Sequence, residues 1–328
     1  MLAFLVQRLF QAVLVMLAVA VIAFALFNYV GDPISSMVGQ DTSVADRERL
    51  RQELGLDDSF IVQFARFAGR AARGNFGLSY QQARPVGQII LEKMPATLEL
   101  SFVAATLALI IGVPIGIYTG LHRDTWLSQL LLAVSLVGVS LPTFLIGILL
   151  ILVFAVMLGW LPSFGRGSVV HFGWWSSGLV TLDGWRAIIM PAVTLSLFQM
   201  TLIMRLVRAE MFEVLRTDYI KFARARGLTN RTVNFGHALK NTLVPVITIA
   251  GLQLGSIIAF AIITETVFQW PGMGLMFIQA VSFADIPVMA AYLVLVGFFF
   301  VVINLVVDLL YHAVDPRLRL DRERVGVG

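Results

Sequence analysis

The sequence contains no cysteine among its 328 residues, which excludes a disulfide framework and every metal site built on thiolates. Charged residues are also scarce, because they make up 13% of the chain against about 25% in soluble domains. Hydrophobic residues make up 58%, and the mean hydropathy is +0.86. This composition is that of an integral membrane protein.

The motifs of nucleotide binding and of common hydrolytic chemistry are missing as well. None of the three lysines, Lys93, Lys221 and Lys240, follows a glycine, so the phosphate-binding sequence G-x-x-x-x-G-K-[ST] cannot occur. Neither H-E-x-x-H nor G-x-S-x-G is present. His171 has no His, Cys or carboxylate at ligand spacing. We therefore expect no catalytic, cofactor-binding or metal-binding residue in this chain, and no enzyme activity of its own.

Long apolar runs predict an all-α fold with six transmembrane helices, since one span needs about 20 residues. The first run is longer than the core of a signal peptide, about 7 to 15 residues, so we favour a retained span over a cleaved leader. Pro114 and Pro142 predict kinks in the second and third spans. The Trp-rich segment at 159–187 suits the membrane interface. The six spans are expected at about 9–30, 99–121, 129–158, 188–207, 243–264 and 288–311.

The distribution of basic residues predicts the orientation of these spans. Eight Lys or Arg and only three acids lie between residues 205 and 240, and such an excess near span ends marks the cytoplasmic side. The short outer loops hold only Arg166 and Arg186, whereas the proposed cytoplasmic segments hold 14 basic residues. We therefore expect both termini in the cytoplasm, with the polar insert at 31–94 outside.

The basic segment at 217–245 predicts a helix, a sharp turn and a second helix. Residues 219–226 favour a helix, and Gly227 is the residue type that best takes the left-handed conformation ending one. Leu228 follows where a Schellman-type stop places an apolar contact, and Thr229 can cap the next helix. Basic loops are common in membrane proteins, so charge alone does not define a function here.

The polar insert predicts two short helices. Ser43 and Asp46 resemble a capping box at the start of the first helix, and Gly55 supplies a stop. The second helix is expected from about residue 58 to 74. Its Arg66, Arg70 and Arg73 are spaced to share one face. They form either a solvated or headgroup-facing stripe or a docking face for a soluble partner.

Several stretches carry a resemblance to a known family. The basic segment resembles the cytoplasmic EAA loop of ABC importer permeases, in which Ala223, Gly227 and Leu239 match. Lys221, Phe222, His237 and Lys240 depart from the general pattern. ARARGL and HALKNTLVPVIT, together with TETVFQWPGMG at 264–274, look like the dipeptide and oligopeptide branch. So do LGLDDSF, GNFGLS, RPVG and PATLEL, and the match covers nearly the whole chain.

The resemblance implies a permease subunit that forms half of a translocation pathway in the bacterial cytoplasmic (inner) membrane. It implies as partners a second permease of similar fold, two ABC ATPase subunits that use the ATP, and an extracytoplasmic binding protein. Peptide, nickel-chelate and glutathione importers share these sequence motifs, so the resemblance does not decide among these three substrates. A secondary transporter is the competing class, but it would normally keep ionisable residues deep in its spans.

The same resemblance divides the chain and selects its site. The divisions are a first span at 1–30, an extracytoplasmic helical insert at 31–94, a core permease domain at 95–312 with a coupling loop at about 209–242, and a basic cytoplasmic tail at 313–328. The residues expected to couple the chain to the ATPase are Tyr219, Phe222, Ala223, Arg224, Ala225, Arg226, Gly227 and Leu228, and those expected at the binding-protein face are Arg66, Arg70 and Arg73.

Overall fold

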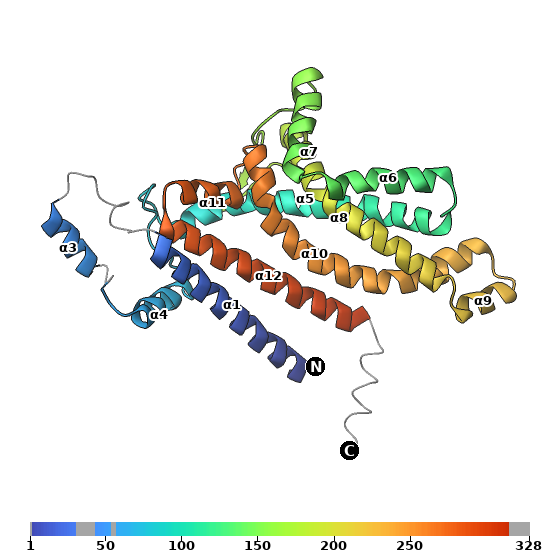
Figure 1. Cartoon of the computed structure of the whole chain (residues 1–328), viewed down its shortest axis with the longest axis horizontal. Coiled ribbons are helices and arrows are strands. Elements are labelled where there is room, and N and C mark those ends of the chain that lie inside the picture. The colour runs from blue at the N-terminus through green and yellow to red at the C-terminus, as the bar shows by residue number, and fades with distance from the viewer. Residues whose placement is uncertain (1, 31–42, 54–56, 315–328) are drawn as a thin grey trace, which may run out of the picture. The chain divides into compact units, whose positions relative to one another are not determined.

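The computed structural model of the chain describes residues 2–30, 43–53 and 57–314, and they are mostly helical (Figure 1). The elements in chain order are α1 (Leu2–Val30), α3 (Val44–Glu53), α4 (Phe60–Ala71), α5 (Val86–Leu121), α6 (Trp126–Ser140), α7 (Thr143–Leu150), the π-helix η1 (Ile151–Met157), β1 (Val170–Phe172), β2 (Trp175–Ser177), α8 (Leu182–Val214), α9 (Asp218–Ala225), the π-helix η2 (Thr232–Ala238), α10 (Leu239–Val267), α11 (Met273–Ser282) and α12 (Ile286–Val314).

Four helices in the described ranges are long and apolar enough to cross a membrane. They are Val6–Ala25, Val86–Leu121, Leu182–Leu215 and Ile286–Val307. The pair Trp126–Ser140 and Thr143–Met157 adds a fifth if it counts as one broken span, and Gly255–Val267 and Met273–Ser282 are shorter apolar helices. The all-α membrane fold is thus confirmed, while the number of six spans stays a prediction.

Prolines affect the apolar helices differently. The chain breaks between Ser140 and Thr143, where the flanking helices are inclined by 107°, so the predicted kink at Pro142 is confirmed. Helix α5 is continuous through Pro114 over 36 residues, and the kink expected at Pro114 stays a prediction. Helices α8 and α10 contain Pro191 and Pro245 in their interiors.

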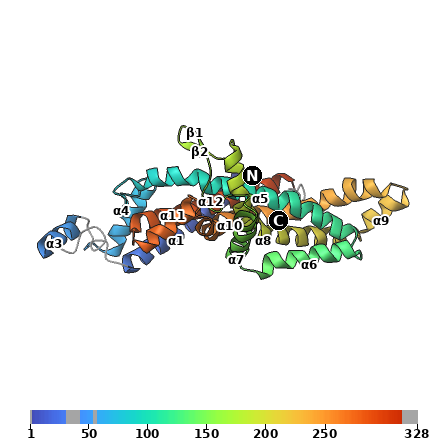
Figure 2. The same cartoon turned by 90° about the horizontal axis from the view of Figure 1, so that it is seen from above.

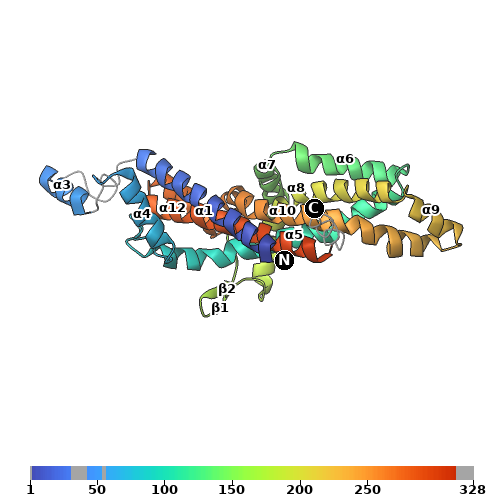
Figure 3. The same cartoon turned by 90° about the horizontal axis from the view of Figure 1, so that it is seen from below.

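The helices gather into two compact units, and the first comprises 1–98, 164–185 and 269–301. Its core is apolar and includes Ala23, Ile89, Met273 and Ala291, which come from four different helices. Helices α1 and α12 run side by side in this unit, where a Cβ on Gly297 would lie 3.1 Å from Val19 (Figures 1 and 3).

The polar insert belongs to the first unit. Ser43 Oγ accepts a hydrogen bond from the Asp46 amide at 3.1 Å and donates to its carboxylate at 2.7 Å, so the predicted start of α3 is confirmed. The expected stop at Gly55 lies outside the described residues. Helix α4 packs on α1 through Phe24, whose ring centroid lies 5.3 to 5.8 Å from those of Phe60, Phe64 and Phe67.

A two-stranded hairpin in the Trp-rich segment was not expected in an all-α chain. Strand β1 pairs antiparallel with β2 in the register Val170↔Ser177 and Phe172↔Trp175 (Figure 2). A two-residue turn joins the strands, and Gly173 takes the positive φ of 63° that such turns require. Beneath it, buried Arg166 donates hydrogen bonds to the Ser176 hydroxyl at 2.9 Å and carbonyl at 2.6 Å.

The second unit comprises 99–163, 186–268 and 302–328, and a row of glycines brings two of its helices close together. Gly112, Gly116 and Gly120 repeat every four residues along α5 and face α8. A Cβ on Gly116 would lie 2.6 Å from the Val207 Cβ, closer than real side chains approach. Small residues at this spacing allow membrane helices to pack backbone to backbone. The end of α5 is therefore held against the end of α8.

Candidate functional site

The predicted helix-turn-helix forms between α8 and α10. Helix α9 (Asp218–Ala225) begins after the extended residue Thr217, and Gly227, whose φ is 78°, lies two residues beyond its end. The Gly227 amide donates to the Arg224 carbonyl at 2.9 Å, and the Leu228 amide donates to the Ala223 carbonyl at 3.4 Å. These two bonds define a Schellman stop, so the predicted end of the helix is confirmed.

The start of the following helix is also as predicted. Thr229 Oγ1 accepts a hydrogen bond from the Thr232 amide at 3.3 Å, which satisfies a backbone donor that a helix start leaves free. The π-helix η2 then leads into α10. Buried Thr242 of α10 lies with its hydroxyl 3.2 Å from Met211 Sδ of α8. The end of α8 and the start of α10 thus hold the turn from both sides.

Helix α9 has one buried face and one exposed face. Ile220 and Ala223 are buried in a core with Val207, Met211 and Val233. Ala223 is one of the residues expected to couple the chain to the ATPase, and its side chain packs inside this chain. The exposed predicted coupling residues are Tyr219, Phe222, Arg224, Ala225, Arg226, Gly227 and Leu228.

Phe222 is the most prominent apolar side chain on the exposed face, since it is 65% exposed. The Arg226 guanidinium lies 5.8 Å from its ring centroid. Tyr219 is held differently, because its hydroxyl accepts a hydrogen bond from the Asn241 side chain of α10. Lys221 forms an ion pair with Asp218 at 2.9 Å, and this hydrogen bond lowers the pKa of the Asp218 carboxyl. An exposed aromatic flanked by arginines is a surface suited to a protein partner.

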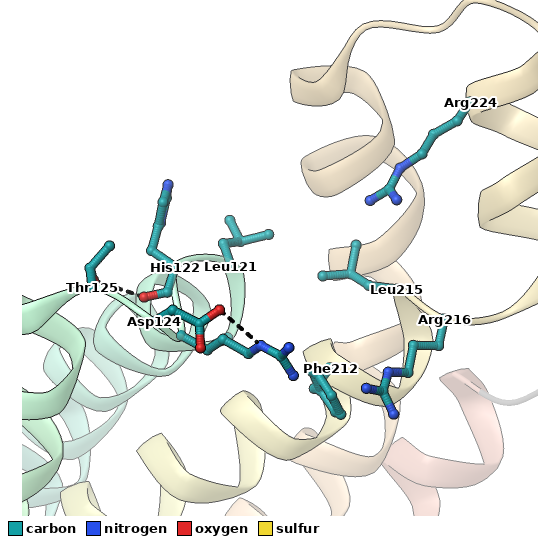
Figure 4. A pocket seen from close by; sticks show the side chains of 10 residues that line it. Leu121, His122, Asp124, Thr125, Phe212, Leu215, Arg216 and Arg224 are labelled. Carbon is teal, nitrogen blue, oxygen red and sulfur yellow. Dashed lines mark hydrogen bonds and ion pairs between the residues drawn. The ribbon is translucent and has the colours of Figure 1, made fainter.

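Two open hollows lie where the α5–α6 turn meets the end of α8, and the first also borders α9 through Arg224. The first, of about 400 Å³, is lined by residues 120–125 together with Phe212, Leu215, Arg216 and Arg224 (Figure 4). The second, of about 300 Å³, is lined by Thr119, Gly120, Arg123, Arg205, Arg208, Ala209 and Phe212. The turn at 122–124 and the basic segment, both expected in the cytoplasm, thus lie together.

The predicted docking arginines of the polar insert are all exposed, but they are not equivalent. Arg66 forms an ion pair with Asp58 at 2.6 Å, which neutralises part of its charge. Arg70 lies in the last turn of α4, and Arg73 lies beyond Ala71, where the helix ends earlier than expected. Arg70 and Arg73 therefore carry most of the available positive charge.

Sequence reasoning missed a buried polar network in the first unit. The Asp285 carboxylate is 2% exposed and accepts hydrogen bonds from the Ser79 hydroxyl, from the Tyr80 amide at 3.1 Å and from the Gln81 amide at 3.3 Å. Burial and this carboxylate raise the pKa of the Tyr80 phenol. More than 200 residues separate the partners, so no local sequence pattern predicts the contact. It ties the loop before α5 to the α11–α12 turn.

Within the described ranges, no group of three or more His, Cys, Asp or Glu side chains could hold a metal ion. Long apolar helices, with the short amphipathic helix α9 set between α8 and α10 by sharp turns, define a polytopic membrane protein. The chain belongs to the family described as "Binding-protein-dependent transport system inner membrane component", which matches residues 112–320. Residues 1–101 match the corresponding N-terminal family, "Binding-prot-dependent transport system membrane comp, N-term".

Relatives of similar length support this assignment. The chain is 36% identical to the dipeptide transport system permease protein DppB of Alkalihalophilus pseudofirmus, over 97% of this chain and 100% of that protein. It is 38% identical to the probable D,D-dipeptide transport system permease protein DdpB of Escherichia coli, over 95% and 96%. It is 35% identical to the glutathione transport system permease protein GsiC of Escherichia coli, over 97% and 99%.

A solved structure shows the same fold. A chain of the MetNI methionine ABC transporter, in an inward-facing conformation, superposes with a TM-score of 0.52 at 20% identity, covering 69% of this chain and 96% of that chain. The permease fold expected from the sequence is therefore confirmed.

Proposed function

We propose that this chain forms half of the translocation pathway of an ABC importer for peptides. The carrying observation is identity of 35 to 38% over nearly the full length to permeases named for dipeptide, D,D-dipeptide and glutathione transport. Glutathione is itself a small peptide, so one substrate class accommodates all three names. The remaining half of the pathway comes from a second permease of similar fold.

Energy enters through separate subunits in this proposal. The sequence contains no P-loop motif. In this proposal two ABC ATPase subunits therefore bind the ATP, and this chain needs no cofactor. The basic segment faces the cytoplasm, as the excess of Arg predicts, and both termini lie on that side. An extracytoplasmic binding protein delivers the substrate to the opposite face. The protein lies in the bacterial cytoplasmic membrane.

Helix α9 is the contact through which the ATPase subunits act. Its exposed Phe222 and arginines meet the ATPase, while Ile220 and Ala223 pack on residues of α8 and η2. A tightly packed core transmits displacement instead of absorbing it. Movement of α9 therefore moves the ends of α8 and α10 together, and these helices lead directly into the membrane.

Reconstitution tests the proposal. The chain, expressed with its partner permease and two ATPase subunits, is purified into liposomes and supplied with the binding protein. We expect ATP-dependent uptake of a labelled dipeptide or tripeptide, and we expect the ATPase subunits to co-purify with the chain. Uptake driven by a proton or sodium gradient without ATPase subunits would overturn the proposal in favour of a secondary transporter.

A further inference from the structure

Five arginines line the two hollows between the α5–α6 turn and the end of α8. Arg123 comes from the α5–α6 turn, Arg205 and Arg208 from α8, and Arg216 and Arg224 from the segment that follows. Asp124 is the one acid among the lining residues, and it pairs with Arg123 at 3.3 Å. In the described part of the chain, the other four arginines form no ion pair. Within the described residues, the lining of the hollows therefore carries a positive charge that ion pairs leave largely unbalanced.

The cations converge on one aromatic ring. The Arg216 guanidinium lies 3.8 Å from the Phe212 ring centroid, and that of Arg123 lies 5.1 Å from the same centroid. Figure 4 shows Arg216 beside Phe212 and Arg224 above them, with His122 and Asp124 of the α5–α6 turn across the space. Contact with a ring face stabilises a guanidinium and orients it. An anion in the hollow would relieve the repulsion between these like charges.

The position of the arginines along α8 favours a lipid over a soluble ligand as the bound anion. Arg205 lies seven residues before Phe212 on α8, about 10 Å along the axis, and falls within the apolar helix Leu182–Leu215. The second hollow, which contains Arg205 and Arg208, also has Gly120, Ala209 and Phe212 in its lining. Cations that begin within a span and continue beyond its end match the headgroup layer of a bilayer. An acidic side chain of a soluble subunit would have to enter the span to reach Arg205.

We propose that these two hollows, which share Gly120, Arg123 and Phe212, bind the phosphate headgroup of an anionic phospholipid. Basic pockets between membrane helices near the cytoplasmic surface are suited to such headgroups. The glycine row on α5 creates the site, because it brings the α5–α6 turn to the end of α8. A lipid seated there touches both the turn and the segment that carries α9. The inference goes beyond the proposed transport function and depends on neither its substrate nor its partners.

Photocrosslinking tests the site in the intact chain. The purified protein is placed in nanodiscs that contain either phosphatidylglycerol or phosphatidylcholine, each with the same photoactivatable group next to its phosphate, and crosslinks are mapped by mass spectrometry. We expect phosphatidylglycerol to label residues 119–125 and 205–216 at least fivefold more than phosphatidylcholine. Equal labelling by the two lipids would overturn the proposal without any variant.

A charge-matched pair of variants locates the effect. Arg123→Gln/Arg216→Gln removes two cations from the hollows, whereas Arg231→Gln/Lys240→Gln removes two exposed cations that line neither. Each arginine near an anionic surface contributes about fivefold in affinity, so the first variant should lose about 25-fold in headgroup affinity and the second little. Equal losses would show a general surface potential and overturn the site.

Two competitors distinguish the lipid from other anions. Inorganic phosphate, tested against sodium chloride of equal ionic strength, should leave the labelling unchanged, because acyl chains anchor the lipid. Addition of the ATPase subunits should leave the labelling of residues 205–208 unchanged, because Arg224 is the lining residue that lies on α9, the helix proposed to meet these subunits. Displacement by phosphate would assign the hollows to a soluble anion, and displacement by the ATPase subunits would assign them to the protein interface. Uptake plays no part in these measurements, so failure of the transport proposal would leave them interpretable.

Discussion

Gly227 sets the direction in which the chain leaves α9. Its φ of 78° lies in the left-handed region, and a Cβ added there would meet no atom within 4 Å. A substitution therefore acts through backbone strain alone. A β-branched residue in this conformation costs on the order of 1 to 2 kcal/mol, whereas Asn tolerates it better.

We expect Gly227→Val to fold and insert but to weaken coupling. Transport should fall, and ATP hydrolysis should lose its stimulation by loaded binding protein. Gly227→Asn is the matched control and should retain both activities. The measurement is substrate-stimulated ATPase activity of the complete transporter in liposomes. Normal stimulation in Gly227→Val would show that the turn ends a helix and has no mechanical role.

Asp285 stabilises the loop before α5 through three hydrogen bonds. We expect Asp285→Ala to lower the free energy of unfolding by about 1 to 3 kcal/mol, because the Tyr80 and Gln81 amides lose their acceptor. Ser79→Ala should cost less, since it leaves both amides bonded. Thermal unfolding of the purified protein in detergent measures the order of the two effects. Equal stability of Asp285→Ala and the parent would contradict this role.

Among the elements, helix α9 has a buried face and an exposed face, and we expect substitutions on the two faces to have different effects. Ile220→Ala opens a cavity in a closed core and should destabilise the protein by about 2 to 5 kcal/mol. Phe222→Ala removes a side chain that is 65% exposed, so it should leave stability within about 0.5 kcal/mol. It should instead weaken co-purification of the ATPase subunits. Retained ATPase binding in Phe222→Ala would place the contact elsewhere.

Arg70 and Arg73, at and just beyond the end of α4, form a second surface that can be tested. We expect Arg70→Gln/Arg73→Gln to weaken binding-protein affinity severalfold, with a loss that shrinks as salt rises, because exposed charges are screened beyond about 10 Å at 0.1 M. Arg66→Gln is the control and should have a smaller effect, since Asp58 already pairs with this cation. Affinity titrations at two salt concentrations measure both. An unchanged affinity and salt slope would leave a solvated or headgroup-facing surface.

Local chemistry explains which elements could be predicted from the sequence. The Schellman stop at Gly227 and the cap at Ser43 each depend on residues within a few positions of one another, so both could be predicted from the sequence. The convergence of Arg123 on Phe212 depends on the packing of α5 against α8, and the Asp285 network joins residues more than 200 positions apart. Such contacts arise from tertiary packing, which periodicity and capping rules do not encode.

At the scale of the whole molecule, the composition predicts a membrane protein. The exposure of individual residues decides which of them can be labelled to test its topology. Ser79 and Ser177 are obvious polar positions for cysteine substitution in the expected outer segments. The structure shows them to be 2% and 8% exposed, so a reagent would reach them poorly on either side of the membrane. Exposed Gln82 and His171 lie near them in the chain, and Thr229 is exposed in the turn after α9.

The native chain lacks cysteine, so each single cysteine reports alone. We expect Gln82→Cys and His171→Cys to react with a membrane-impermeant maleimide in intact cells. Thr229→Cys should react only after the cells are opened, because we propose that the basic segment lies in the cytoplasm. Reaction of all three under denaturing conditions controls for expression. Labelling of Thr229→Cys from outside would reverse the orientation, and with it the side on which α9 could meet an ATPase.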